Sequence, residues 1–100
     1  MYKISVSEKA QAQFEQITRY MLSVLLSAQA ASDFVDALDK KYKQIAKEPH
    51  LYPYERFGRS LYHKATLNKY ILAFRIDEAT RTVHIIAIGH SLQKRKNIVK

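Results

Sequence analysis

The spacing of apolar residues changes from a helical to a strand period at one point in the chain, and this change limits the possible folds more than any other feature. Residues 49–58 hold both prolines and one of the two glycines of the 100-residue sequence. Proline lacks a backbone N–H and interrupts helices and strands, so this segment predicts an extended loop. We therefore expect a helical half before the loop and a half built of strands after it.

The first half predicts a short strand and two helices. Residues 2–6 alternate between polar and apolar, as strands do, and Ser7 followed by an acid is typical of a helix N-cap. Apolar residues three and four apart predict one helix over residues 8–27 and a second over residues 27–46, ended by Pro49. The short connection predicts an antiparallel hairpin, whose apolar stripes, expected in the core, run over residues 14–25 and 34–45.

The second half predicts an antiparallel meander of three strands. Residues 60–66, 69–76 and 82–89 are rich in β-branched and aromatic side chains. Residues 91–100 predict a short helix or a basic tail. The order strand, helix, helix, strands indicates an α+β domain with the hairpin packed on one face of the sheet, and a chain of this length has room for one such domain, residues 1–100.

The positive charge of the chain is concentrated in its second half. The formal net charge is +8, from 17 basic and nine acidic residues. Residues 1–59 contain nine basic and seven acidic residues, whereas residues 60–100 contain eight basic and two acidic residues together with three of the four histidines. Basic side chains interleaved with tyrosines on a sheet are typical of a surface that binds a polyanion.

Several classes of protein and of site are disfavoured by the composition. The sequence has no cysteine, which excludes disulfides and thiolate chemistry and fits a cytoplasmic location. No apolar run approaches the roughly 20 residues of a membrane span, and we expect neither a signal peptide nor a membrane partner. The four histidines lack the spacing of a known ligand set, so we expect no metal and no cofactor.

Four segments between Pro49 and His90 carry a resemblance to a known family. They are PHLYP from Pro49, LYHK from Leu61, NKYILAFRIDE from Asn68 and TVHIIAIGH from Thr82. In these segments, and in its size, charge and element order, the chain resembles the RelE/ParE superfamily of small bacterial toxins of the plasmid-stabilisation type. The resemblance implies the toxin of a type II toxin–antitoxin system, which a small cognate antitoxin wraps and neutralises.

Three functions are compatible with this resemblance, and the fold does not choose among them. RelE-like members cleave messenger RNA on the ribosome without a metal, and we place such an endoribonuclease, or mRNA interferase, first. ParE-like members poison DNA gyrase, and a degenerate member would only bind its antitoxin or a nucleic acid. RelE-like sequences commonly have an arginine after the aromatic residue that corresponds to Tyr70, whereas this chain has Ile71.

RNA cleavage without a metal needs a base, an acid and cations around the phosphate. Histidine titrates near neutral pH, so His90 and then His63 are the first candidates for the acid and base, ahead of Glu55. Strand alternation places Arg75 on the face away from Phe74, where it would meet a phosphate. The candidates for substrate binding, each with an ordinary structural interpretation as well, are Tyr62, Lys64, Tyr70, Lys94 and Arg95.

Overall fold

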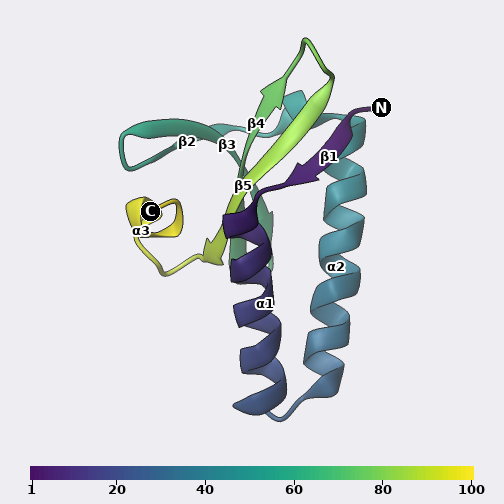
Figure 1. Ribbon diagram of the computed structural model, residues 1–100, viewed down its shortest axis with the longest axis vertical. Coiled ribbons are helices and arrows are strands. Elements are labelled where there is room, and N and C mark those ends of the chain that lie inside the picture. Colours follow the sequence, from purple (N-terminus) through teal and green to yellow (C-terminus); the bar gives the residue numbers. More distant parts are fainter.

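A computed structural model, which describes residues 1–100, has a five-stranded sheet between a long helical hairpin and a one-turn helix (Figure 1). The helices are α1 (Glu8–Ser23), α2 (Ala28–Lys47) and α3 (Arg95–Ile98), with a 3-10 helix, η1 (Pro49–Leu51), after α2. The strands are β1 (Lys3–Val6), β2 (Tyr54–Phe57), β3 (Ser60–Leu67), β4 (Tyr70–Asp77) and β5 (Thr82–His90). The predicted α+β class, with its N-terminal strand, hairpin and C-terminal sheet, is confirmed.

The sheet contains the predicted meander and two further strands. Its order is β1-β5-β4-β3-β2, and every neighbouring pair is antiparallel except β1 and β5, which are parallel. The prediction of one extended loop over residues 49–58 is wrong, because β2 forms within it and pairs with β3. Gly58, with φ of 68°, makes the tight turn between them, a conformation that glycine adopts without steric cost.

Helix α1 begins where the sequence predicts and ends earlier. The Ser7 hydroxyl accepts a hydrogen bond from the Ala10 N–H at 3.0 Å and donates one to the Ile86 carbonyl at 2.8 Å, which ties the helix start to β5. The helix ends at Ser23, and the hairpin extends beyond the sheet (Figure 1). Val24 and Leu25 are therefore 61% and 52% exposed, which corrects their predicted place in the core.

The main core lies between the helical hairpin and one face of the sheet, which we call the inner face. The strands contribute side chains that alternate along β4 and β5, among them Leu72, Phe74, Val83 and Ile85. The helices cover them with buried residues of their apolar stripes, mainly Ala10, Met21, Phe34, Leu38 and Ile45. The sheet face that carries Leu72 and Phe74 is thus closed to solvent by α1 and α2.

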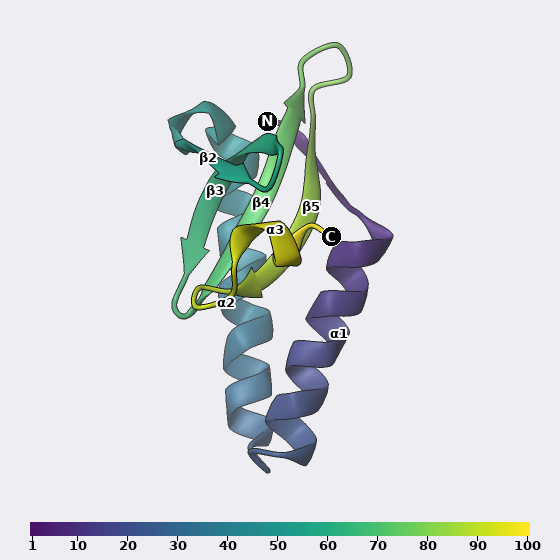
Figure 2. The ribbon, with the colours of Figure 1, turned by 90° about the vertical axis from the view of Figure 1, so that its left-hand side faces the viewer.

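The opposite, outer face of the sheet has a smaller core beneath α3 (Figure 2). Its five buried residues form what we call the outer cluster, and they are Phe57, Ile71, Ala73, Ala87 and Ile98. The register between β4 and β5 shifts between Ala73 and Phe74, so that Ala73 pairs with Ala87 and Phe74 with Ile85. Ile98 of α3 is fully buried over Gly89. Because Gly89 has no side chain, it leaves room for the Ile98 side chain.

Candidate functional site

The outer face of the sheet carries two of the predicted cations, and a carboxylate joins them. Glu55 of β2 accepts a hydrogen bond from the Lys64 ammonium at 2.9 Å and another from Arg95 Nε at 2.5 Å. Arg95 also donates through Nη1 to the Ser91 carbonyl at 2.9 Å. Glu55 therefore offsets one of the two positive charges and fastens the start of α3 to β2.

The two cations also change the titration of Glu55. The hydrogen bond from Lys64, and then the one from Arg95, lower the pKa of the Glu55 carboxyl below its ordinary value of 4.5. A carboxylate with a lowered pKa holds protons weakly and is a poor general base near neutral pH. The position of Glu55 is thus better suited to binding α3 than to removing a proton.

Replacing Glu55 with glutamine is expected to destabilise the protein at neutral pH by about 1 kcal/mol, since partly exposed ion pairs contribute little each. The folded-state pKa is lowered, so the stabilisation is complete above pH 4.5 and is lost as the pH falls through the lowered pKa. Urea unfolding of both proteins at several pH values tests this. The variant Glu48→Gln, which changes an exposed carboxylate without an ion pair, is the control. Equal pH dependence of Glu55→Gln and wild type would contradict the prediction.

The open part of the outer face lies beside the outer cluster and holds Arg75, His84 and Tyr62. Arg75 is exposed on β4, as alternation predicts, and pairs across the strands with His84 of β5. Tyr62 is half-buried, and its ring lies against Phe57 at 6.0 Å in an edge-on geometry. Arg75 takes part in no ion pair, so it is a cation free to meet an anion.

His63 points to the inner face and is buried. Its ring stacks on Phe74 at 5.1 Å and on Tyr54 at 4.0 Å, and only 4% of the residue is exposed. Its Nδ1 lies 2.7 Å from the Tyr52 carbonyl, which can only accept, so the proton must be on Nδ1. His63 thus fixes the segment after η1 against the sheet.

Tyr70 and His90 also lie on the inner face, at the end of the sheet near the tip of α1. Their rings meet edge-on at 5.6 Å, and the Tyr70 ring packs on Phe34 at 5.0 Å. His90 Nδ1 accepts a hydrogen bond from the Leu92 N–H at 3.1 Å, so the neutral ring carries its proton on Nε2. Both residues line a groove of about 520 Å³, whose other lining residues are Gln16, Ile17, Tyr20, Leu25 and Lys69.

The predicted site residues are therefore divided between the two faces of the sheet. Tyr62, Lys64, Arg75 and Arg95 belong to the outer face, and His63, Tyr70 and His90 to the inner face. Lys94 is exposed just before α3. The sequence predicts Glu55 only as a third candidate for the acid or base. It does not predict the two ion pairs of Glu55, because nothing around this residue, two positions after Pro53, indicates which cations lie beside it.

A second polar cluster ties the N-terminal segment to the β4–β5 turn. Tyr2 donates to Glu78 Oε2 at 2.9 Å, and His50 Nε2 lies 2.6 Å from Glu78 Oε1. The bond from Tyr2, followed by the one from His50, lowers the Glu78 pKa. No three histidine, aspartate or glutamate side chains gather where they would hold a metal ion, and no helix is long and apolar enough to span a bilayer.

The fold resembles that of a solved protein, and the sequence matches one family model. A chain of the toxin–antitoxin complex RelBE2 from Mycobacterium tuberculosis has a similar structure, with a TM-score of 0.57 and 18% identity over 89% of this chain and 96% of that chain. No curated protein matches the sequence. The family model for the ParE toxin of the type II toxin–antitoxin system parDE matches residues 4–95. The chain belongs to the ParE toxin family.

As a ParE toxin family member, the protein is the toxin of a type II toxin–antitoxin system, as the sequence resemblance implied. The match runs from Ile4 in β1 through both long helices and the other four strands, and it ends at Arg95, where α3 begins. The groove beside His90 and the open outer face are thus both parts of the toxin domain itself.

Proposed function

We propose that this ParE toxin family member acts by binding and poisoning DNA gyrase, and that it does not cut messenger RNA. The observation that carries the proposal is the separation of His63 and His90 from Arg75 by the sheet. Cleavage of RNA without a metal requires the acid, the base and the cations around one phosphate. Side chains on opposite faces of a sheet do not meet at one phosphate group.

The centre of the outer face supports the same proposal. Ile71, at the position where RelE-like sequences commonly have arginine, is only 2% exposed and belongs to the outer cluster. Beside it, Lys64 and Arg95 are engaged by Glu55. An apolar cluster covered by a helix offers no group to stabilise a phosphorane, whereas it does provide a rigid support for a binding surface.

We further propose that a cognate antitoxin neutralises the toxin by occupying the groove beside Tyr70 and His90. RelBE2, the structural relative, is a toxin–antitoxin complex. The groove combines apolar side chains such as Ile17 and Leu25 with the cationic Lys69, and Leu25 adjoins the tip of the hairpin, where Leu26 is 81% exposed. A toxin with a net charge of +8 attracts an acidic, amphipathic segment, and this association is fast and sensitive to salt.

The test measures both target activities with the same purified toxin. In a supercoiling assay with purified gyrase, we expect the toxin to inhibit supercoiling, and in cells we expect a DNA-damage response. Primer extension on messages from the same cells is expected to show unchanged ends. Toxin preincubated with its antitoxin is the control and should leave supercoiling intact. Undiminished supercoiling at saturating toxin would rule out the gyrase proposal.

A ribosome-dependent endoribonuclease is the second candidate, and the pair Arg75 and His84 is the observation that favours it. The two side chains lie next to each other on the exposed outer face, near Tyr62. If messages acquire defined cuts that disappear with Arg75→Ala, this second candidate is correct. If neither cuts nor loss of supercoiling occurs and expression of the chain leaves growth normal, the protein is a non-toxic member.

A further inference from the structure

Three basic side chains that are far apart in the sequence gather where the β2–β3 turn meets the C-terminal segment. Arg59 from the turn and Lys96 and Lys100 from the end of the chain line one hollow of about 430 Å³. All three residues are exposed. Two hydrogen-bonding residues, Ser60 and Asn97, line the same hollow. We call these five residues the terminal basic site.

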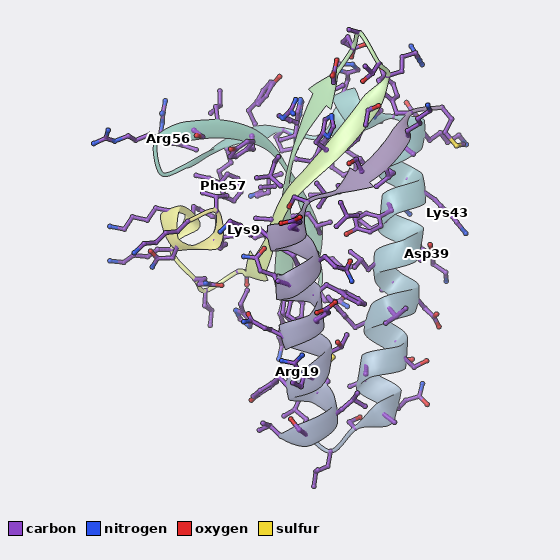
Figure 3. All side chains as sticks on the ribbon, in the orientation of Figure 1. Lys9, Arg19, Asp39, Lys43, Arg56 and Phe57 are labelled. Atoms are coloured by element: carbon purple, nitrogen blue, oxygen red, sulfur yellow. The ribbon has the colours of Figure 1, made fainter.

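The first turn of α1 brings a fourth cation to this region. The Lys9 ammonium donates a hydrogen bond to the backbone carbonyl of Lys100. Figure 3 shows Lys9 at the upper end of α1, on the side of the helix that faces α3, and Phe57 between β2 and α3. The positive charge at this end of the molecule therefore comes from three separate segments of the chain.

The spacing of the site is fixed before any ligand arrives. The turn residue Gly58 packs so closely on α3 that a Cβ atom there would lie 3.3 Å from the Cβ of Lys96. Ile98 is fully buried in the outer cluster, and Arg95 is bonded to Glu55. Binding of a ligand to both the turn and α3 thus orders the exposed side chains but does not have to bring the two backbone segments together, because they are already in contact.

No aspartate or glutamate side chain forms an ion pair with the cations of the site. All four ion pairs of the structure involve other basic residues, namely Lys43, His50, Lys64 and Arg95. Glu55 is the acid nearest to Arg59 in the sequence, and it is engaged by Lys64 and Arg95. The positive potential at the terminal basic site is therefore available to an anion from outside.

We propose that the terminal basic site binds the phosphate backbone of duplex DNA. Arginine and lysine neutralise phosphates, and neutral donors such as the Ser60 hydroxyl and the Asn97 amide complete such contacts. An acidic amphipathic peptide would also require exposed apolar contacts, whereas Phe57 is 1% exposed and Val99 is half-buried. The choice of duplex DNA among polyanions rests on the proposed function, since DNA is the substrate of gyrase.

The test measures DNA binding by the full-length toxin alone, without gyrase. Fluorescence anisotropy with a short labelled duplex gives the association constant over a range of salt concentrations. The double variant Arg59→Gln/Lys96→Gln is expected to reduce the slope of log K against log salt by about 1.8, or roughly 0.9 for each phosphate that is no longer neutralised. The matched control, Arg19→Gln/Lys40→Gln, removes the same two charges from exposed positions on the hairpin and should change the slope much less.

A charge-retaining variant and two other anionic ligands distinguish duplex binding at this site from general attraction of anions. Arg59→Lys/Lys96→Arg retains both charges and should keep the wild-type slope, and thermal unfolding verifies that each variant folds. Equal reductions of slope in the two glutamine variants would mean that net charge alone attracts DNA and would overturn the proposal. The proposal would also be overturned if the binding of single-stranded RNA or polyglutamate depended on Arg59 and Lys96 as strongly as the binding of the duplex does. The supercoiling assay, run separately, reports only on the gyrase proposal.

Discussion

Phe74→Ala is expected to destabilise the protein by about 3–5 kcal/mol, the range found for truncation of a fully buried aromatic side chain. Phe74 has no exposed surface, and its ring contacts His63 at 5.1 Å and Tyr52 at 5.7 Å on the inner face. The substitution leaves a cavity and also removes the surface on which the buried imidazole stacks. For a domain of this size, Tm falls by about 4–8 °C for each kcal/mol of destabilisation.

Tyr54, which stacks on the same His63 ring as Phe74, provides the control for this prediction. Tyr54 stacks on His63 at 4.0 Å but is 63% exposed, so Tyr54→Ala is expected to cost about 1 kcal/mol or less. Urea unfolding of both variants gives the two free energies. Similar destabilisation by Phe74→Ala and Tyr54→Ala would show that stacking on the histidine, and not burial in the main core, determines the stability at this position.

Gly89→Val is expected to release α3 from the outer face while the rest of the fold persists. A Cβ atom at Gly89 would lie 2.5 Å from Ile98 Cγ1, 2.8 Å from Cδ1 and 2.9 Å from Cγ2. Overpacking of this kind typically costs about 1–3 kcal/mol, which increases the population with α3 detached by roughly 5- to 150-fold. Limited trypsin digestion should cut faster after Lys94, Arg95 and Lys96, with an unchanged far-UV spectrum from the helical hairpin.

A double-mutant cycle with Ile98→Ala identifies the cause. If the clash with the Ile98 side chain detaches α3, the double variant Gly89→Val/Ile98→Ala should be cut by trypsin more slowly than Gly89→Val alone, because the valine fills space that the isoleucine has left. Strictly additive effects of the two substitutions would contradict this account. The cycle is also informative about the terminal basic site, since the packing of α3 on the outer face holds Lys96 near the β2–β3 turn.

The periodicity of the apolar residues predicts most of the fold, because burial of one face of a helix or strand requires apolar side chains at a regular spacing. Alternation along β4 correctly places Arg75 with Ile71 and Ala73, away from Phe74. The same rule applied to β3 puts His63 on the face opposite Tyr62 and Lys64, so the division of the predicted site was already present in the sequence. Strand β2 was missed because Pro53 and Gly58 on either side of it are typical of a loop.

The contacts that define the candidate site depend on how distant segments pack, and periodicity carries no information about them. Nothing in the sequence indicates that Glu55 meets both Lys64 and Arg95, or that Arg59 and Lys96 line one hollow. Exposure of Val24 and Leu25 likewise follows from the length of the hairpin relative to the sheet, and not from their own apolar character.

The parallel pairing of β1 with β5 determines when in its synthesis the chain can reach this structure. Lys3 pairs with Thr82 and Val6 with Ile85, so the first strand of the chain has no partner until the last strand has been made. Such distant pairings carry a high entropic cost of loop closure and form slowly. A nascent chain on the ribosome therefore lacks an edge strand of its sheet until residues 82–85 have been made, and the complete sheet forms only after all the intervening elements are present.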